Sequence, residues 1–109
     1  MNSTTNDIKT MIGQMIMVGL RGTSPDDAKY FFRHLNGLTI GGVILYDQNV
    51  TTSPPSSHNI LSPEQVKDFN EALQSFSPTP LLIGIDQEGG QVNRLKESYG
   101  FPPSKSWAE

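Results

Sequence analysis

The segment Leu81-Leu82-Ile83-Gly84-Ile85 decides the fold class, because it is apolar at nearly every position and follows a polar, proline-rich stretch. Its length and composition are typical of a strand that is buried on both faces of a parallel sheet. Two earlier stretches have the same character, namely 16–20 and 38–46, the second centred on Val43 to Tyr46. We therefore predict three buried strands.

Helical patterns separate these strands. Ser24-Pro25 and Ser62-Pro63 each place a capping serine before a proline that suits the first helical position, and Gln65 completes a predicted capping box with Ser62. The apolar stripes of the three predicted helices are Ile8, Met11, Ile12 and Met15; Ala28, Phe31, Phe32 and Leu35; and Val66, Phe69, Leu73 and Phe76. A polar loop is expected over 50–59, and 86–103 is expected to be mostly loop, with a further helix starting near Ser104.

Alternating helices and apolar strands predict an α/β fold with a parallel sheet and outer helices. With 109 residues the chain is too short for a closed (β/α)₈ barrel, which needs about 250. Two interpretations remain open at this point. The chain is either the first two and a half units of such a barrel, truncated near Ser104, or a small open three-stranded domain.

Composition excludes several classes of protein. Eight Lys and Arg against eleven Asp and Glu give a net charge of -3, so no basic surface for nucleic acid is expected. The absence of Cys excludes disulfides, thiolate metal sites and a Cys nucleophile. No apolar run approaches the roughly 20 residues that span a bilayer, and 15–20 is too short for a signal peptide. We expect a soluble, cytoplasmic protein with no membrane partner.

The densest group of functional side chains is Asp86-Gln87-Glu88-Gly89-Gly90-Gln91-Val92-Asn93-Arg94. It follows the third strand, and active sites of parallel α/β folds lie at the carboxyl ends of strands. Asp86 could hold a polar ligand, and Arg94 could bind hydroxyl or carboxylate groups. Turn formation by Asp86, positive φ at the glycines and a solvated Glu88–Arg94 pair explain the same residues equally well.

Weaker candidates lie elsewhere. Asp47, Gln48 and Asn49 follow the second strand and should share an edge with Asp86, as ligand contacts or as turn residues. His34 is expected to interact with a helix end and His58 to be solvated. The methionines at 11, 15 and 17 are expected to fill the core. Two nearby carboxylates, Asp86 and Glu88, are a weak signal for a metal, and we predict none.

The segment 80–90, followed by Val92 and Arg94, closely resembles the third-strand region of glycoside hydrolase family 3, and in particular its bacterial β-N-acetylhexosaminidase branch. Three further segments agree in order and spacing: Ile12-Gly13-Gln14-Met15, Gly41-Gly42-Val43-Ile44-Leu45-Tyr46 with Asn49, and Phe101-Pro102-Pro103-Ser104. The resemblance covers nearly the whole chain.

The resemblance implies a TIM-type barrel that hydrolyses β-glycosides with retention and without metal or other cofactor. The implied substrate is a terminal β-linked N-acetylglucosamine or related β-glycoside, often in peptidoglycan fragments. Asp86 matches the family's Asp that binds sugar hydroxyls, and Arg94 matches an Arg that binds the same sugar. The nucleophile and the acid/base lie downstream in the family, so no catalytic residue is assigned within 1–109, and the chain alone is expected to be inactive. Gln48 and Gln91 stand where the family often has Arg, which puts recognition of an anionic aglycone in doubt.

Two other hypotheses compete with a glycosidase segment. One is a non-catalytic sugar-binding or scaffold α/β module. The other is a small nucleotide-binding domain, but Arg21-Gly22-Thr23-Ser24 lacks the glycine-rich turn that such a domain carries after its first strand. An open sheet of three strands leaves two unpaired edges, so we expect the isolated chain to self-associate or to require further polypeptide.

Overall fold

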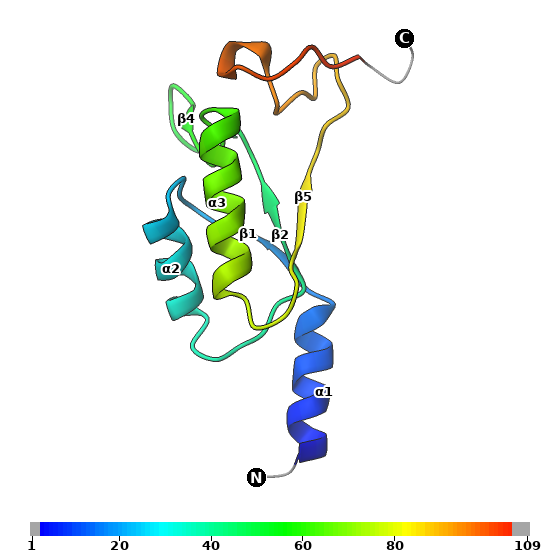
Figure 1. Ribbon diagram of the computed structural model, residues 1–109. Helices are drawn as coiled ribbons and strands as arrows, with labels where there is room; N and C mark the ends of the chain where they lie inside the picture. The colour runs from blue at the N-terminus through cyan, green and yellow to red at the C-terminus, as the bar shows by residue number, and fades with distance from the viewer. Residues whose placement is uncertain (1–2, 106–109) are drawn as a thin grey trace.

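The computed structural model describes residues 3–105, with side chains from Asp7 onward, and its centre is a three-stranded parallel sheet (Figure 1). The strands β1 (Met17–Gly19), β2 (Gly42–Leu45) and β5 (Leu82–Ile85) lie in the order β1-β2-β5. The register places Val43 between Val18 and Ile83. The prediction of an α/β fold with three parallel strands is confirmed, although each strand is shorter than the apolar segment that contains it.

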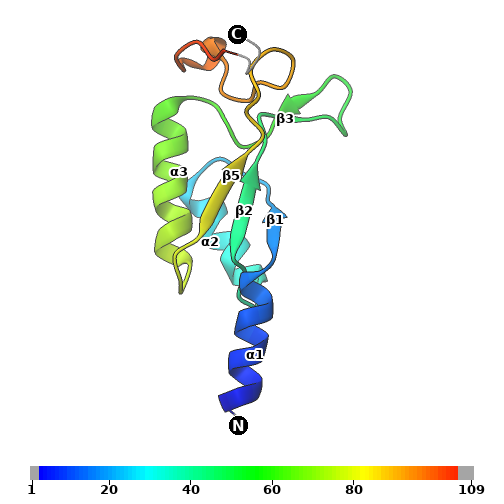
Figure 2. The ribbon, with the colours of Figure 1, turned by 90° about the vertical axis from the view of Figure 1, so that its right-hand side faces the viewer.

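Two helices cover one face of this sheet, as Figure 2 shows. They are α2 (Pro25–His34) and α3 (Pro63–Phe76), and both were predicted. Phe69 and Leu73 of α3 are fully buried together with Val43 of the central strand. Burying a Phe or Leu side chain contributes about 1.5–3 kcal/mol each, so this buried cluster contributes substantially to the stability of the fold.

The helix starts follow the predicted chemistry, with one difference. The Ser24 hydroxyl accepts a hydrogen bond from Asp27 N (3.2 Å), while Asp27 Oδ2 accepts one from Ser24 N (3.1 Å), which completes a capping box. At α3 the Ser62 hydroxyl accepts from Gln65 N (3.1 Å), but Gln65 Oε1 accepts from Leu61 N instead of Ser62 N. The capping box predicted at Ser62 is therefore only half formed, because the Gln65 side chain is used in packing α3 against neighbouring loops.

The N-terminal helix α1 (Ser3–Gln14) forms as predicted but projects beyond the amino end of the sheet (Figures 1 and 2). Its apolar stripe is exposed: Met11 is 63% and Met15 86% accessible. The expectation that these methionines fill the core was wrong, because no other described element reaches the stripe. Gln14 fastens the end of the helix to the body by donating a hydrogen bond from Nε2 to Ile40 O (3.0 Å).

The face of the sheet opposite α2 and α3 is not covered by any described element (Figure 2). Leu82 is 70% and Met17 46% exposed there. The Met17 side chain lies across Gly42 and Gly84, where a Cβ would meet its Cε or Sδ. The sequence predicted strands buried on both faces, and Met17 as core filler. Within residues 3–105 only one face is buried, because the chain supplies helices to that face alone.

The polar segment after β2 is more ordered than a plain loop. It forms a short antiparallel hairpin of β3 (Gln48–Asn49) and β4 (Ser56–Ser57). The predicted loop ended at Asn59, yet this side chain is fully buried. After β5 the chain is mostly loop, as predicted, with one short 3₁₀ helix, η1 (Glu97–Tyr99). A helix body after Ser104 would lie outside the described residues.

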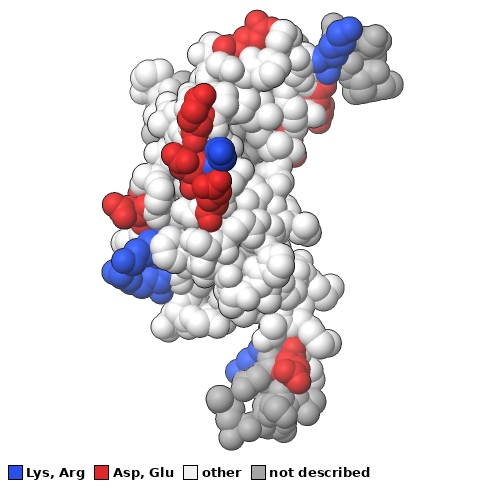
Figure 3. Space-filling view, in the orientation of Figure 1, with Lys and Arg blue, Asp and Glu red and all other residues white. Residues whose placement is uncertain are grey.

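Charged side chains are unevenly distributed over the surface. In Figure 3 they gather over α2 and α3, whereas the flank toward the uncovered sheet face carries few charges. Lys and Arg do not form a continuous basic surface in this view, in keeping with the net charge of -3. No helix within residues 3–105 is both long and apolar enough to cross a bilayer.

Candidate functional site

The parallel sheet brings polar residues from two strands to one edge. Leu45 and Ile85 are register partners at the carboxyl ends of β2 and β5. Asp47 therefore follows β2 at the same edge where Asp86 follows β5. The sequence predicted this shared edge, and the structure confirms it. The two carboxylates differ in environment, since Asp47 is 2% exposed and Asp86 is exposed.

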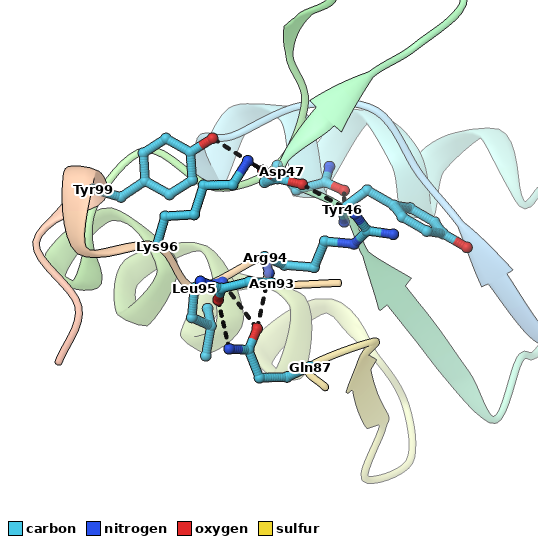
Figure 4. A network of polar contacts seen from close by, with 9 residues as sticks. Tyr46, Asp47, Gln87, Asn93, Arg94, Leu95, Lys96 and Tyr99 are labelled. Atoms are coloured by element: carbon cyan, nitrogen blue, oxygen red, sulfur yellow. Dashed lines mark hydrogen bonds and ion pairs between the residues drawn. The ribbon is translucent and has the colours of Figure 1, made fainter. Parts of the chain in front are cut away.

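Asp47 is the centre of the polar network at this edge (Figure 4). Its Oδ2 accepts hydrogen bonds from Lys96 Nζ (2.5 Å) and from the Tyr99 hydroxyl (3.0 Å). Its Oδ1 lies 3.7 Å from Arg94 Nη1. A buried carboxylate is tolerated only when it is paired and hydrogen-bonded, and the loop after β5 supplies all three of these partners.

Gln87 shapes the loop that carries those partners. Its Oε1 accepts hydrogen bonds from the backbone N–H groups of Arg94 (2.8 Å) and Leu95 (3.0 Å), and its Nε2 donates to Asn93 Oδ1 (2.6 Å) (Figure 4). The turn between is closed by Gly89 and Gly90, both at positive φ (73° and 53°). The paired glycines therefore have the positive φ that the sequence offered as an explanation of them.

Arg94 is directed toward the end of β2. Besides its pairing with Asp47, its guanidinium lies 5.8 Å from the centre of the Tyr46 ring, within the range of a cation–π contact. Its ionic partner is Asp47, whereas the sequence suggested Glu88. The side chain is 29% exposed, and its Nε is buried with no hydrogen-bond partner among the described residues.

The network changes the protonation equilibria of two of its members. The hydrogen bond to Asp47 raises the pKa of Lys96, more than burial of the ammonium lowers it. Burial raises the pKa of the Tyr99 phenol, and its hydrogen bond to Asp47 adds to that effect. Lys96 is therefore a firmly charged donor, and Tyr99 a neutral one, at any physiological pH.

The side chain of Asn59 joins the segments that follow β1 and β2 at this edge. Its Oδ1 accepts a hydrogen bond from Tyr46 N (2.9 Å), and its Nδ2 donates to Leu20 O (3.1 Å) and Gly22 O (2.9 Å). One side chain thus fixes the chain leaving β1 relative to the chain leaving β2. Sequence reasoning missed Asn59, Lys96 and Tyr99, because their partners lie between 13 and 52 positions away in sequence.

The two histidines are not brought together. His34 contacts Tyr30 O through Nδ1 (2.9 Å) in α2, at the helix end where the sequence placed its interaction. His58 is half-buried, with its ring centre 6.3 Å from that of Tyr46. No cluster of three or more His, Asp or Glu side chains suited to a metal occurs within the described range of 3–105.

An exposed carboxylate, Asp86, and a restrained guanidinium, Arg94, thus occupy the active-site edge of a parallel α/β fold. Carboxylate acceptors and guanidinium donors suit a ligand rich in hydroxyl groups. The fold and this edge define an α/β segment with a cluster of polar side chains at the carboxyl ends of its strands.

Residues 7–109 match the glycosyl hydrolase family 3 N-terminal domain, and the chain belongs to this family. It is 35% identical over 90 residues to a beta-hexosaminidase of Alkalilimnicola ehrlichii, which covers 82% of this chain and 22% of that protein. A beta-hexosaminidase of Stenotrophomonas maltophilia is 32% identical over 91 residues, with 82% and 23% covered. One from Vibrio cholerae is 35% identical over 71 residues, with 64% and 18% covered. The chain spans about a fifth of the length of these relatives.

Proposed function

We propose that this chain forms part of the sugar subsite of a retaining β-glycosidase that removes terminal β-linked N-acetylglucosamine. The sheet and its outer helices would be the first two and a half units of a TIM-type barrel. The nucleophile and the acid/base would come from polypeptide beyond these 109 residues. The family match and the names of the relatives support this proposal.

The position of Asp86 is the single observation that carries it. This carboxylate follows β5 directly and is exposed at the carboxyl edge of the sheet. A carboxylate can accept hydrogen bonds from two neighbouring sugar hydroxyls, and each charge-assisted bond is worth about 1.5–3 kcal/mol. Arg94, eight residues later, would donate to the same sugar from the other arm of the loop.

The proposal accounts for the absence of an assigned nucleophile. Retention requires two catalytic groups facing each other across the scissile bond, one as nucleophile and one as acid/base. Asp86 and Arg94 bind and orient the sugar in this scheme, and neither forms a bond to it. The 109-residue chain alone is therefore expected to leave a glycoside intact.

Hydrolysis of an aryl β-N-acetylglucosaminide tests the proposal. The 109-residue chain is compared with a longer polypeptide that carries it, each as wild type, Asp86→Ala and Glu88→Ala. The longer polypeptide should be active and the short chain silent, and Asp86→Ala should lower kcat/KM about 100-fold, as expected for loss of charge-assisted hydrogen bonds. Glu88→Ala is the matched control, because Glu88 is an exposed carboxylate of the same loop, and it should change kcat/KM less than threefold.

Three results would contradict the proposal. They are an inactive longer polypeptide, equal effects of the two substitutions, and hydrolysis by the short chain that Asp86→Ala abolishes. Sugar binding without hydrolysis by either polypeptide would instead support a non-catalytic carbohydrate-binding module.

A further inference from the structure

Asp47 is a buried carboxylate whose two oxygens serve different purposes. Oδ2 holds Lys96 and Tyr99, which lie at the far end of the loop after β5, whereas Oδ1 faces Arg94. Asp47, which follows β2, therefore fixes both the course of the loop after β5 and the side chain of Arg94. Asp86 is the first residue of that loop, directly after β5, and is exposed.

The surroundings of Arg94 restrict its rotation. The carboxylate of Asp47 lies on one side of the guanidinium, and the Tyr46 ring lies 5.8 Å from it. Figure 4 shows the side chain extending from the loop toward Tyr46 and Asp47. An arginine carries about 2 kcal/mol of rotamer entropy, and a ligand gains affinity when this ordering precedes binding.

A purely structural role would not require this arrangement. Lys96 and Tyr99 alone give the buried Oδ2 two donors, so the loop is already attached without Arg94. The additional contact at Oδ1 is longer, 3.7 Å, and leaves the Arg94 side chain 29% exposed. Arg94 is thus directed by Asp47 and still open to a ligand, which is the combination that a positioning residue must produce.

We propose that Asp47 is a positioning residue for ligand binding, acting through Arg94, and this inference rests on the proposed sugar subsite. Removing its charge without changing its shape frees the guanidinium and weakens the binding of sugar. The effect exists only while Arg94 is present, because Asp47 does not itself touch the ligand.

A double-mutant cycle on the full 109-residue chain tests this, with methyl β-N-acetylglucosaminide as the probe. Binding is followed by NMR titration in wild type, Asp47→Asn, Arg94→Ala and the double variant. Asp47→Asn should raise Kd about tenfold in the presence of Arg94 and less than twofold in its absence. Asp26→Asn is the matched control, because it removes an exposed carboxylate at the start of α2, and it should leave Kd unchanged.

A second readout needs no ligand. NMR relaxation of the Arg94 Nε–H group should show restricted side-chain motion in the wild type and faster motion in Asp47→Asn. If Asp47→Asn fails to fold, Asp47→Asn combined with Lys96→Met replaces it, since this pair removes the ammonium partner of Asp47 together with the carboxylate charge. It should free Arg94 in the same way.

The outcomes separate the two proposals. No binding by the wild type, with Arg94 released in Asp47→Asn, would refute sugar binding by this chain while supporting the positioning of Arg94. An unchanged Arg94 signal in the substituted protein, or equal effects of Asp47→Asn with and without Arg94, would overturn the role of Asp47.

Discussion

The two faces of the sheet differ sharply although the same three strands form them. On the face under α2 and α3, Val43 is fully buried and Leu45 is 2% exposed; on the opposite face Leu82 is 70% exposed. In Figure 3 the middle of the flank toward that second face carries few charged residues. The first face is covered by α2 and α3, whereas the second has apolar side chains such as Leu82 and no cover among residues 3–105. Stability and association should therefore respond to different substitutions.

The largest effect is expected on the covered face. Phe69→Ala should reduce the free energy of unfolding by about 3–5 kcal/mol, because it leaves a cavity where α3 meets β2. Phe76→Ala is the matched control on the same helix, since Phe76 is 40% exposed, and it should cost much less. Urea unfolding followed by circular dichroism measures both. Equal losses would mean that α3 does not pack as described.

The junction between β1 and β2 should respond next. Asn59→Ala removes one acceptor and two donors from a fully buried position and leaves Tyr46 N, Leu20 O and Gly22 O without partners. An unsatisfied buried group costs about 1–3 kcal/mol. Only the bond to Leu20 O is fully buried, and those to Tyr46 N and Gly22 O are partly buried, so a total loss of about 2–3 kcal/mol is expected by thermal unfolding. A loss below 0.5 kcal/mol, which is usual for a surface position, would contradict the bridging role.

The uncovered face should control association instead of folding. We expect the isolated chain to self-associate, because apolar surface and two open strand edges seek partners. Leu82→Gln should weaken association about tenfold in light scattering while changing unfolding by less than about 0.5 kcal/mol. Val50→Gln is the control, since Val50 is 78% exposed in the hairpin segment. A monomer at high concentration would disprove the expectation.

The smallest expected effect is a pH dependence of stability, and it arises at the carboxyl edge of the sheet where Tyr99 contacts Asp47. Burial and the bond to Asp47 raise the pKa of Tyr99. A raised pKa in the folded state gives stability that is complete below the unfolded value, about 10, and is lost as the pH rises above it. Ultraviolet titration of the folded protein should show a phenol ionisation step above the ordinary range of tyrosine. Tyr99→Phe should remove that late step, whereas Tyr30→Phe should retain it.

Local chemistry carried most of the fold prediction. Ser24 and Ser62 with their following prolines placed the starts of α2 and α3, and the apolar segments placed all three parallel strands. These signals act over a few residues, through capping bonds and side-chain periodicity. The exposure of Met11, Met15 and Leu82 could not be predicted. An apolar pattern identifies side chains suited to burial, but it does not identify the element that packs against them.

The candidate site divides in the same way. The position of Asp86 and Arg94 after an apolar strand, and the edge that they share with Asp47, followed from the sequence together with the parallel order of the strands. The partnership of Asp47 with Lys96 and Tyr99, and the burial of Asn59, depended on contacts between distant segments. Packing decides such contacts, because a buried polar group forms hydrogen bonds with the partners that the folded chain places within reach.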